Sequence, residues 1–210
     1  MSTANLPSPN RLRLSGVDWP TYARLLRVFD ERRRLRITYD RGELEIMTLS
    51  PQHERFKHLL GLIVLALAEG FALPIAGFGS MTFRRRGQRR GLEPDECFWI
   101  QHEAAVRGRD QIDLRTDPAP DLVIEVDITR SSLNRLAIYA RMNVPEVWRH
   151  DGQTLAFLVR QSNGEYAAAA QSQAFPRATP ADIERFLALR GQHDETGIVR
   201  QARAWAAAQP

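Results

Sequence analysis

The chain contains one cysteine and one lysine among its 210 residues. Cys97 alone cannot form an intramolecular disulfide or a cysteine-rich zinc site, so we interpret it as a small apolar strand residue. Lys57 is the only lysine, and every other fixed positive side-chain charge belongs to an arginine.

The longest apolar run, LLGLIVLALA over 59–68, is about half as long as a membrane span. The first residues lack the basic-then-apolar pattern of a signal peptide, and we expect a cytoplasmic protein with no membrane partner.

A strong excess of charge is also missing. The formal net charge is +4 and the pI is about 9.8, which makes a polyanionic partner electrostatically plausible without requiring one. A hydrophobic share of 43% and a charged share of 26% are ordinary for a globular protein. We expect a loose arm over residues 1–10, which are small, polar and interrupted by proline, and a single domain over residues 11–210.

Hydrophobic periodicity predicts alternating helices and strands. Helical spacing covers residues 18–31, 51–70, 131–143 (capped by a serine), a segment after Thr179-Pro180, and 194–208. Strand patterns cover residues 74–79, 81–86, a strand opened by EPDECFWI, the run PAPDLVIEVD, and 144–150. Hairpins are predicted at Arg41-Gly42 and at Asn163-Gly164. This order favours an α/β sheet with helices packed on it.

Three carboxylates lie within the predicted strand PDLVIEVD. Side chains alternate along a strand, so Asp121, Glu125 and Asp127 share one face of it. Glu125 lies roughly 13 Å along the strand from Asp121 and about 6.6 Å from Asp127, so one ion cannot be held by both Asp121 and Glu125. We expect the partner carboxylate to be Asp95, if its strand runs beside this one.

A divalent cation is one explanation for such acids. Two buried carboxylates repel each other, and Mg²⁺ removes that cost by taking oxygen ligands. The other explanation is structural: Asp95 and Asp121, each preceded by proline, would cap strand ends, and Glu125 would pair with an arginine. The residues alone leave both explanations open.

The ordered segments EPD (93–95), PDLVIEV (120–126), RLAIY (135–139) and VPEVW (144–148) resemble the Uma-two family of bacterial proteins. This resemblance covers nearly the whole chain. It implies a restriction-endonuclease-like core of the PD-(D/E)xK type: an α/β fold with a mixed central β-sheet flanked by helices, here with an N-terminal helix and a β-hairpin added. It also implies an endonuclease that binds Mg²⁺ or Mn²⁺.

The resemblance carries over to particular residues. Asp95 and Glu125 match the acidic pair that binds the metal, and Glu54 matches the helix acid that often completes such a site. Asp127, which shares the strand face with Glu125, is a further candidate metal ligand. Glu54 could equally be a solvated acid near Lys57, and we read the adjacent His53 as a surface or helix-start histidine.

One departure from the family pattern bears on catalysis. The motif places a lysine two residues after the glutamate, where this chain has Asp127, and the relatives supply a lysine from the next helix, where it has Arg135. Arg135 could offset charge on the phosphate, but an arginine does not act as a base. It could also be a solvated residue, and Lys57 is an alternative source of charge near the site.

The segment RRRGQRRG is the most basic stretch of the chain. Its arginines are candidates for contacts with a nucleic-acid backbone, DNA in the first instance; they are Arg84, Arg85, Arg86, Arg89 and Arg90. Such a segment is also compatible with a solvated hairpin tip. The sequence therefore leaves two functions: a metal-dependent endonuclease, or a catalytically weak nuclease-like protein that binds nucleic acid or a protein partner. A homodimer stays open.

Overall fold

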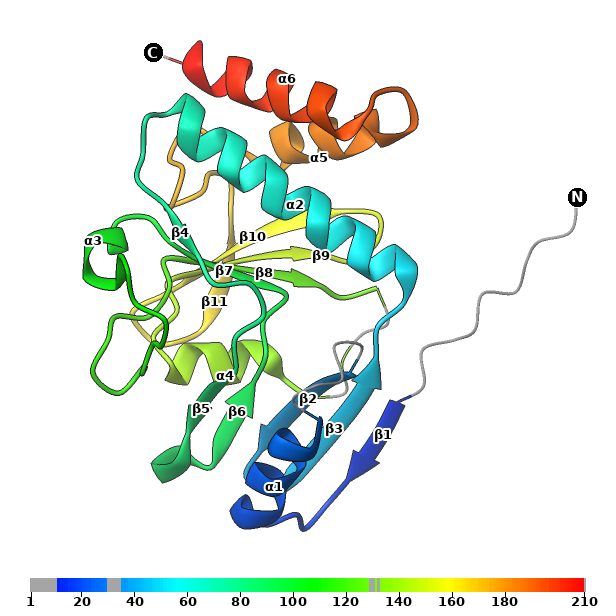
Figure 1. Cartoon of the computed structure of the whole chain (residues 1–210), viewed down its shortest axis with the longest axis vertical. Coiled ribbons are helices and arrows are strands. Elements are labelled where there is room, and N and C mark those ends of the chain that lie inside the picture. Colours follow the sequence, from blue (N-terminus) through cyan, green and yellow to red (C-terminus); the bar gives the residue numbers. More distant parts are fainter. Residues whose placement is uncertain (1–10, 30–34, 129–130, 132, 210) are drawn as a thin grey trace, which may run out of the picture.

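The computed structural model describes residues 11–29, 35–128, 131 and 133–209, so the arm predicted over 1–10 lies outside the described residues. The larger of two sheets has the strand order β11-β10-β9-β8-β7-β4 (Figure 1). Its strands are β4 (Ala76–Gly77), β7 (Glu96–Trp99), β8 (Leu122–Val126), β9 (Glu146–His150), β10 (Leu155–Arg160) and β11 (Tyr166–Ala169). Strands β8 and β9 run parallel and the other neighbours run antiparallel, which gives the predicted mixed sheet.

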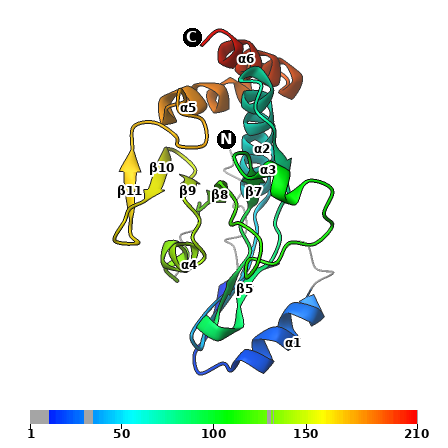
Figure 2. The ribbon, with the colours of Figure 1, turned by 90° about the vertical axis from the view of Figure 1, so that its left-hand side faces the viewer.

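Helices cover both faces of this sheet (Figure 2). The helices α2 (Pro51–Gly70), α5 (Pro180–Ala188) and α6 (Glu195–Ala207) share one apolar core with β8, β9 and β10. Helix α4 (Arg135–Arg141) contributes to a second core on the opposite face. Ser50 caps α2 by accepting a 3.1 Å hydrogen bond from the His53 amide, and Pro51 fits the first turn.

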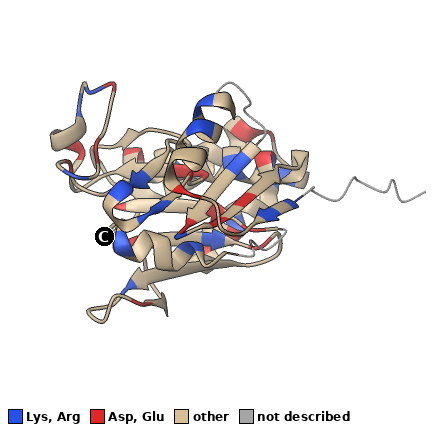
Figure 3. Ribbon diagram, turned by 90° about the horizontal axis from the view of Figure 1, so that it is seen from below, with Lys and Arg blue, Asp and Glu red and all other residues tan. Residues whose placement is uncertain are grey.

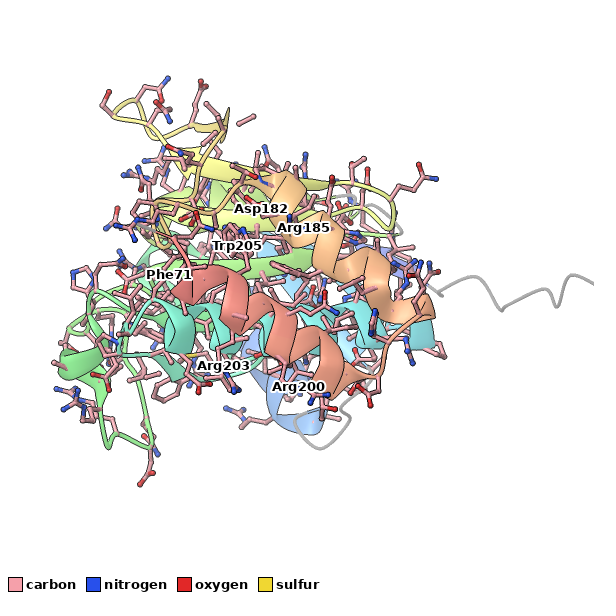
Figure 4. The ribbon with its side chains drawn as sticks, turned by 90° about the horizontal axis from the view of Figure 1, so that it is seen from above. Phe71, Asp182, Arg185, Arg200, Arg203 and Trp205 are labelled. Carbon is pink, nitrogen blue, oxygen red and sulfur yellow. The ribbon has the colours of Figure 1, made fainter. Side chains whose placement is uncertain are left out.

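The C-terminal helix α6 lies directly against α2 (Figure 4). A Cβ atom on Gly70 would come within 2.5 Å of the Arg203 carbonyl oxygen, so only glycine permits this approach. The aromatic rings of Phe71 and Trp205 meet edge-to-face at 6.0 Å beside it. The contact holds α6 over the end of α2 and closes the apolar core.

The smaller sheet has the order β1-β3-β2-β6-β5 and carries α1 (Trp19–Phe29). Its strands are β1 (Arg11–Leu14), β2 (Leu35–Asp40), β3 (Glu43–Thr48), β5 (Phe83–Arg85) and β6 (Arg90–Leu92). The predicted hairpin turns at Arg41 and Gly42, whose φ angles of 50° and 104° both lie in the left-handed region that such a turn requires. Tyr22 of α1 stacks on Tyr39 of β2 at a centroid distance of 4.6 Å.

Several local predictions need correction. Asn134, and not a serine, caps α4, because its side chain accepts a 3.1 Å hydrogen bond from Ala137 N. Strands β1 and β6, the five-stranded sheet that they help to form, and the short helix α3 (Glu103–Val106) were not predicted. Short strands such as β6 leave too few alternating residues for a clear pattern. Among the described residues, no helix is both long enough and apolar enough to cross a bilayer.

Candidate active site

The structure brings Asp95 and Glu125 together. Strands β7 and β8 pair with Glu96 opposite Ile124, and one further step of this register sets Asp95 opposite Glu125. Asp95 continues the ladder, since its amide donates to the Ile124 carbonyl at 3.2 Å and its Oδ2 accepts from Val126 N at 2.6 Å. The side chains of Asp95 and Glu125 are only 1% and 5% exposed. Two carboxylates are therefore buried next to each other.

The guanidinium of Arg36 lies between these two carboxylates. It reaches them from β2 of the smaller sheet: Nη2 forms an ion pair with Asp95 Oδ1, and Nη1 lies 3.5 Å from Glu125 Oε2. Nη2 also lies 3.0 Å from Nε2 of His53. Burial lowers the pKa of Arg36, and the neighbouring positive charge of Arg135 lowers it further. One buried cation thus bridges both acids.

Sequence reasoning missed Arg36. Its strand alternates, with Ile37 and Tyr39 in the apolar cluster under α1 and with Arg36 and Thr38 on the other face. All four residues are buried. The available signal was a basic residue at a regular strand position inside a predicted hairpin. This signal does not indicate which acidic residues the arginine contacts.

Arg135 is anchored on Glu125. Its Nε and Nη2 donate to the two carboxylate oxygens at 3.1 and 2.6 Å, Nη1 donates to Thr38 Oγ1 at 2.5 Å, and Nη2 donates to the Glu93 carbonyl at 2.6 Å. Tyr139, one turn later on α4, donates its hydroxyl to Glu125 Oε1. The alternative of a solvated Arg135 is wrong, because its side chain is 8% exposed.

The charge of Arg135 is fixed by this environment. Burial alone lowers its pKa, but the Glu125 carboxylate and Tyr139 raise it, and the net pKa lies above the ordinary value of a guanidinium. Burial also raises the pKa of the Tyr139 phenol well above its usual value. Arg135 and Tyr139 therefore hold their protons, and their chemical contribution is positive charge and hydrogen bonding.

His53 and Glu54 begin α2 beside the acid pair. His53 lies in the first turn of α2, as the helix-start alternative predicts, but it is buried and not at the surface, and its Nε2 lies 3.0 Å from Asp95 Oδ1. Burial lowers its pKa to about 3, and Arg36 and Lys57 act in the same direction, so the ring is neutral at pH 7. Glu54 is half exposed and contacts the outer nitrogen, Nδ1, of His53 at 3.2 Å. Glu54 is thus linked to Asp95 indirectly, because the two carboxylates contact opposite nitrogens of the His53 ring.

Asp127 lies at the end of β8, beside a pocket of about 140 Å³. Its carboxylate accepts a 3.0 Å hydrogen bond from Ser131 N, and burial raises its pKa, as does the nearby Glu125 charge. The pocket gives access to Glu125. Its described lining residues are Glu125, Asp127, Ser131, Leu133, Asn134, Arg135, Leu136, Tyr139 and Arg149.

Asp121 lies at the opposite end of β8 and makes different contacts. Its Oδ2 accepts hydrogen bonds from the amides of Ile100 and His102 at 2.7 and 3.0 Å, and Oδ1 lies 2.5 Å from Nδ1 of His102. These bonds fix the chain as it leaves β7. Asp121 therefore joins two segments of backbone and stands apart from the acid pair.

The basic segment forms a hairpin between β5 and β6. Arg85 donates to the Leu114 carbonyl at 2.8 Å, and Arg90 forms an ion pair with Asp40 at 2.9 Å. The other three arginine side chains are exposed: Arg84, Arg86 and Arg89. The hairpin therefore offers these three charges to a partner, although Arg89 also donates a long hydrogen bond to the Tyr39 hydroxyl at 3.5 Å. Arg85 and Arg90 are bound within the protein.

Three further arginines in the connection before β8 are paired. The ion pairs are Arg107–Glu103, Arg109–Asp117 and Arg115–Asp113. Figure 3, which views the molecule from below, shows basic and acidic segments interleaved along the ribbon. The exposed arginines of the hairpin are therefore better candidates for nucleic-acid contacts than these paired ones.

The acid pair offers the donor atoms that a divalent cation needs, but Arg36 lies between the two carboxylates. In residues 11–29, 35–128, 131 and 133–209, no three His, Cys, Asp or Glu side chains are grouped as a ready metal site. Asp95 and Glu125 do flank a single cationic group, and their oxygens are the donors that Mg²⁺ and Mn²⁺ prefer. The position between them is taken by the guanidinium of Arg36.

A family model described as "Putative restriction endonuclease" matches residues 19–189. The matched segment runs from α1 to just beyond α5 and contains the acid pair with all of its partners. Together with the mixed sheet and its flanking helices, the match confirms the predicted restriction-endonuclease-like fold. No protein among the curated proteins matches the chain.

Proposed function

Since the chain belongs to the Uma2 family, we propose that it is a metal-dependent endonuclease that hydrolyses phosphodiester bonds in nucleic acid, with DNA as the first substrate to test. The observation that carries the proposal is the buried acid pair, Asp95 opposite Glu125 on adjacent strands. Enzymes with this fold generally use divalent metal ions, and two convergent buried carboxylates suit such an ion.

Asp95 and Glu125 would hold Mg²⁺ or Mn²⁺, with Asp127 as the next nearest acid along the strand. Such an ion, when bound, polarises the phosphate and lowers the pKa of a water molecule. Arg135, held by Glu125 at 2.6 Å, supplies fixed positive charge where the family pattern has a lysine. His53, uncharged at pH 7, holds Asp95 from the side of α2.

Nucleic acid would approach across the pocket that opens onto Glu125, and the exposed arginines of the β5–β6 hairpin would contact its backbone. Contacts of this kind neutralise phosphates without reading sequence, so binding weakens as salt rises. Replacing Arg84, Arg86 and Arg89 together by glutamine should reduce the salt dependence of binding. The matched control is Arg90→Gln, which removes an arginine already paired with Asp40.

The test is cleavage of plasmid DNA and of a single-stranded RNA with Mg²⁺ or Mn²⁺, with and without EDTA. Glu125→Gln should lower cleavage by at least about a hundredfold, since it removes a charge that the metal requires. Glu165→Gln, on the exposed β10–β11 turn, is the control and should cut normally. Equal activity of Glu125→Gln and the wild-type protein would refute the assigned site.

A second function is favoured by one specific observation. Arg36 and Arg135 already balance the two carboxylates, as expected of a site that needs no metal. The protein would then bind nucleic acid without cutting it. Salt-dependent DNA binding by a protein that shows no metal-dependent cleavage of DNA or RNA would support this reading.

A further inference from the structure

The cation between Asp95 and Glu125 belongs to the protein itself. Arg36 extends from the smaller sheet into the larger one, pairs with Asp95 and approaches Glu125 to 3.5 Å. Its side chain is 5% exposed. A buried arginine that bridges two acids stands where a divalent ion between the same acids would have to stand.

The four charged side chains in direct contact balance one another without any added ion. Asp95 and Glu125 contribute two negative charges, and Arg36 and Arg135 contribute two positive charges. A divalent ion added beside both arginines would give these four side chains and the ion a net charge of +2, which the nearby Asp127 carboxylate reduces but does not cancel, and such a buried excess of charge is strongly unfavourable. An ion and both guanidiniums therefore cannot share the acids at low cost.

The two arginines are not held equally. Arg135 donates twice to Glu125 and is also bound by Thr38 Oγ1 and the Glu93 carbonyl. Arg36 pairs closely with Asp95, contacts the uncharged His53, and reaches Glu125 only at 3.5 Å. Arg36 is therefore the cation that can leave with the smaller loss of hydrogen bonds.

We propose that Arg36 is a built-in competitor for the metal site, so that a divalent ion binds between Asp95 and Glu125 only when the Arg36 guanidinium moves away. The inference deepens the proposed function and rests on it for the identity of the ion. It assigns Arg36 a role in setting the metal affinity. Arg36 is a positioning residue by this argument, because it acts through the two acids.

The test is Mn²⁺ binding without nucleic acid, followed by the electron paramagnetic resonance signal of free Mn²⁺. Arg36→Gln should bind Mn²⁺ tighter than the wild-type protein by on the order of tenfold or more, because a like charge has been removed from the site. Arg90→Gln removes a partly buried arginine of the same sheet, paired with Asp40, and should bind as the wild type does. In the double variant Arg36→Gln/Glu125→Gln the gain should disappear.

A measurement on the wild-type protein covers the case in which Arg36→Gln does not fold. Arginine Nε–H signals in ¹⁵N NMR spectra report each buried guanidinium, and Arg36→Lys identifies the Arg36 signal. Titration with Mg²⁺ should shift or broaden the Arg36 signal more than the Arg135 signal.

Three results would overturn the inference: equal Mn²⁺ affinity of the wild type and Arg36→Gln, no binding by either, or a Glu125-dependent ion that leaves the Arg36 signal unchanged. Failure of the proposed function gives another result. Arg36→Gln would then still bind Mn²⁺ more tightly than the wild-type protein, but neither protein would cut DNA or RNA. Cleavage without that gain would refute the competitor role alone.

Discussion

Glu125 in β8 and Glu146 in β9 are buried glutamates on neighbouring strands, but their partners differ in charge. Glu125 meets the guanidiniums of Arg135 and Arg36. Glu146 meets neutral donors, which are Trp148 Nε1 at 2.8 Å, Ser172 Oγ at 3.1 Å, Gln173 N at 2.9 Å and Ala174 N at 2.8 Å. Neutral donors fix a loop, whereas a cation beside an acid is the kind of partner that the proposed metal ion would replace. Both glutamates are buried, so the charge of their partners distinguishes Glu125 of the candidate site from the structural Glu146.

Removal of the cation from Glu125 should have the largest effect. Arg135→Met removes the two hydrogen bonds from the guanidinium to Glu125 and those to Thr38 and the Glu93 carbonyl. Tyr139 and the more distant Arg36 stay as partners of Glu125, and the change should cost about 3–5 kcal/mol of unfolding free energy. Urea denaturation measures this cost. The control, Arg141→Met, alters an exposed arginine at the other end of α4 and should change stability by less than about 0.5 kcal/mol. Similar costs for both variants would show that the buried pair is not special.

Glu146→Ala should cost about 2–4 kcal/mol, because four donors lose one shared acceptor in a buried place. The same variant should keep its Mn²⁺ affinity, since Glu146 is not part of the acid pair. Urea denaturation and the Mn²⁺ titration measure the two properties. A loss of metal affinity as large as that of Glu125→Gln would remove the distinction between the two glutamates.

The stability of the wild-type protein relative to Glu146→Gln should rise as the pH falls from neutral toward the ordinary pKa of a glutamic acid. Burial raises the pKa of Glu146 in the folded protein, against the opposing effect of its donors. Between the unfolded and folded pKa values, the native state keeps a proton that the unfolded chain has lost, so stability falls as pH rises through this interval. Urea denaturation of both proteins at each pH isolates this carboxyl. A difference that is constant with pH would contradict the assignment.

An exposed ion pair should show the smallest effect. Arg203 of α6 pairs with Glu69 of α2 at 2.9 Å, and the two side chains are 43% and 57% exposed (Figure 4). Arg203→Gln should cost at most about 1 kcal/mol, because water screens the pair. Thermal unfolding in low and high salt measures it. A cost close to that of Arg135→Met would mean that burial does not set the strength of these pairs.

Much of the candidate site follows from local sequence. The alternation of PDLVIEVD predicts a buried strand with acids on one face, and the Pro-Asp before CFW predicts a second strand beginning at its acid. The structure pairs these strands and sets Asp95 opposite Glu125. The surroundings of the acids are less predictable: no local pattern indicates the partners of Arg36, His53 begins its helix as predicted but is buried, and the sequence leaves Arg135 between two alternatives. All three depend on which face of one element meets another.

The sequence by itself determined the helices and strands with clear periodicity, the hairpin at Arg41-Gly42 and the acids of the central strand, because these depend on neighbours within a few residues. Only the tertiary structure decided that Arg36 of the smaller sheet lies between Asp95 and Glu125 of the larger one, and that Glu146 fastens the 172–174 loop. Charges buried between distant segments choose partners only when packing excludes water around them, and no local pattern records that choice.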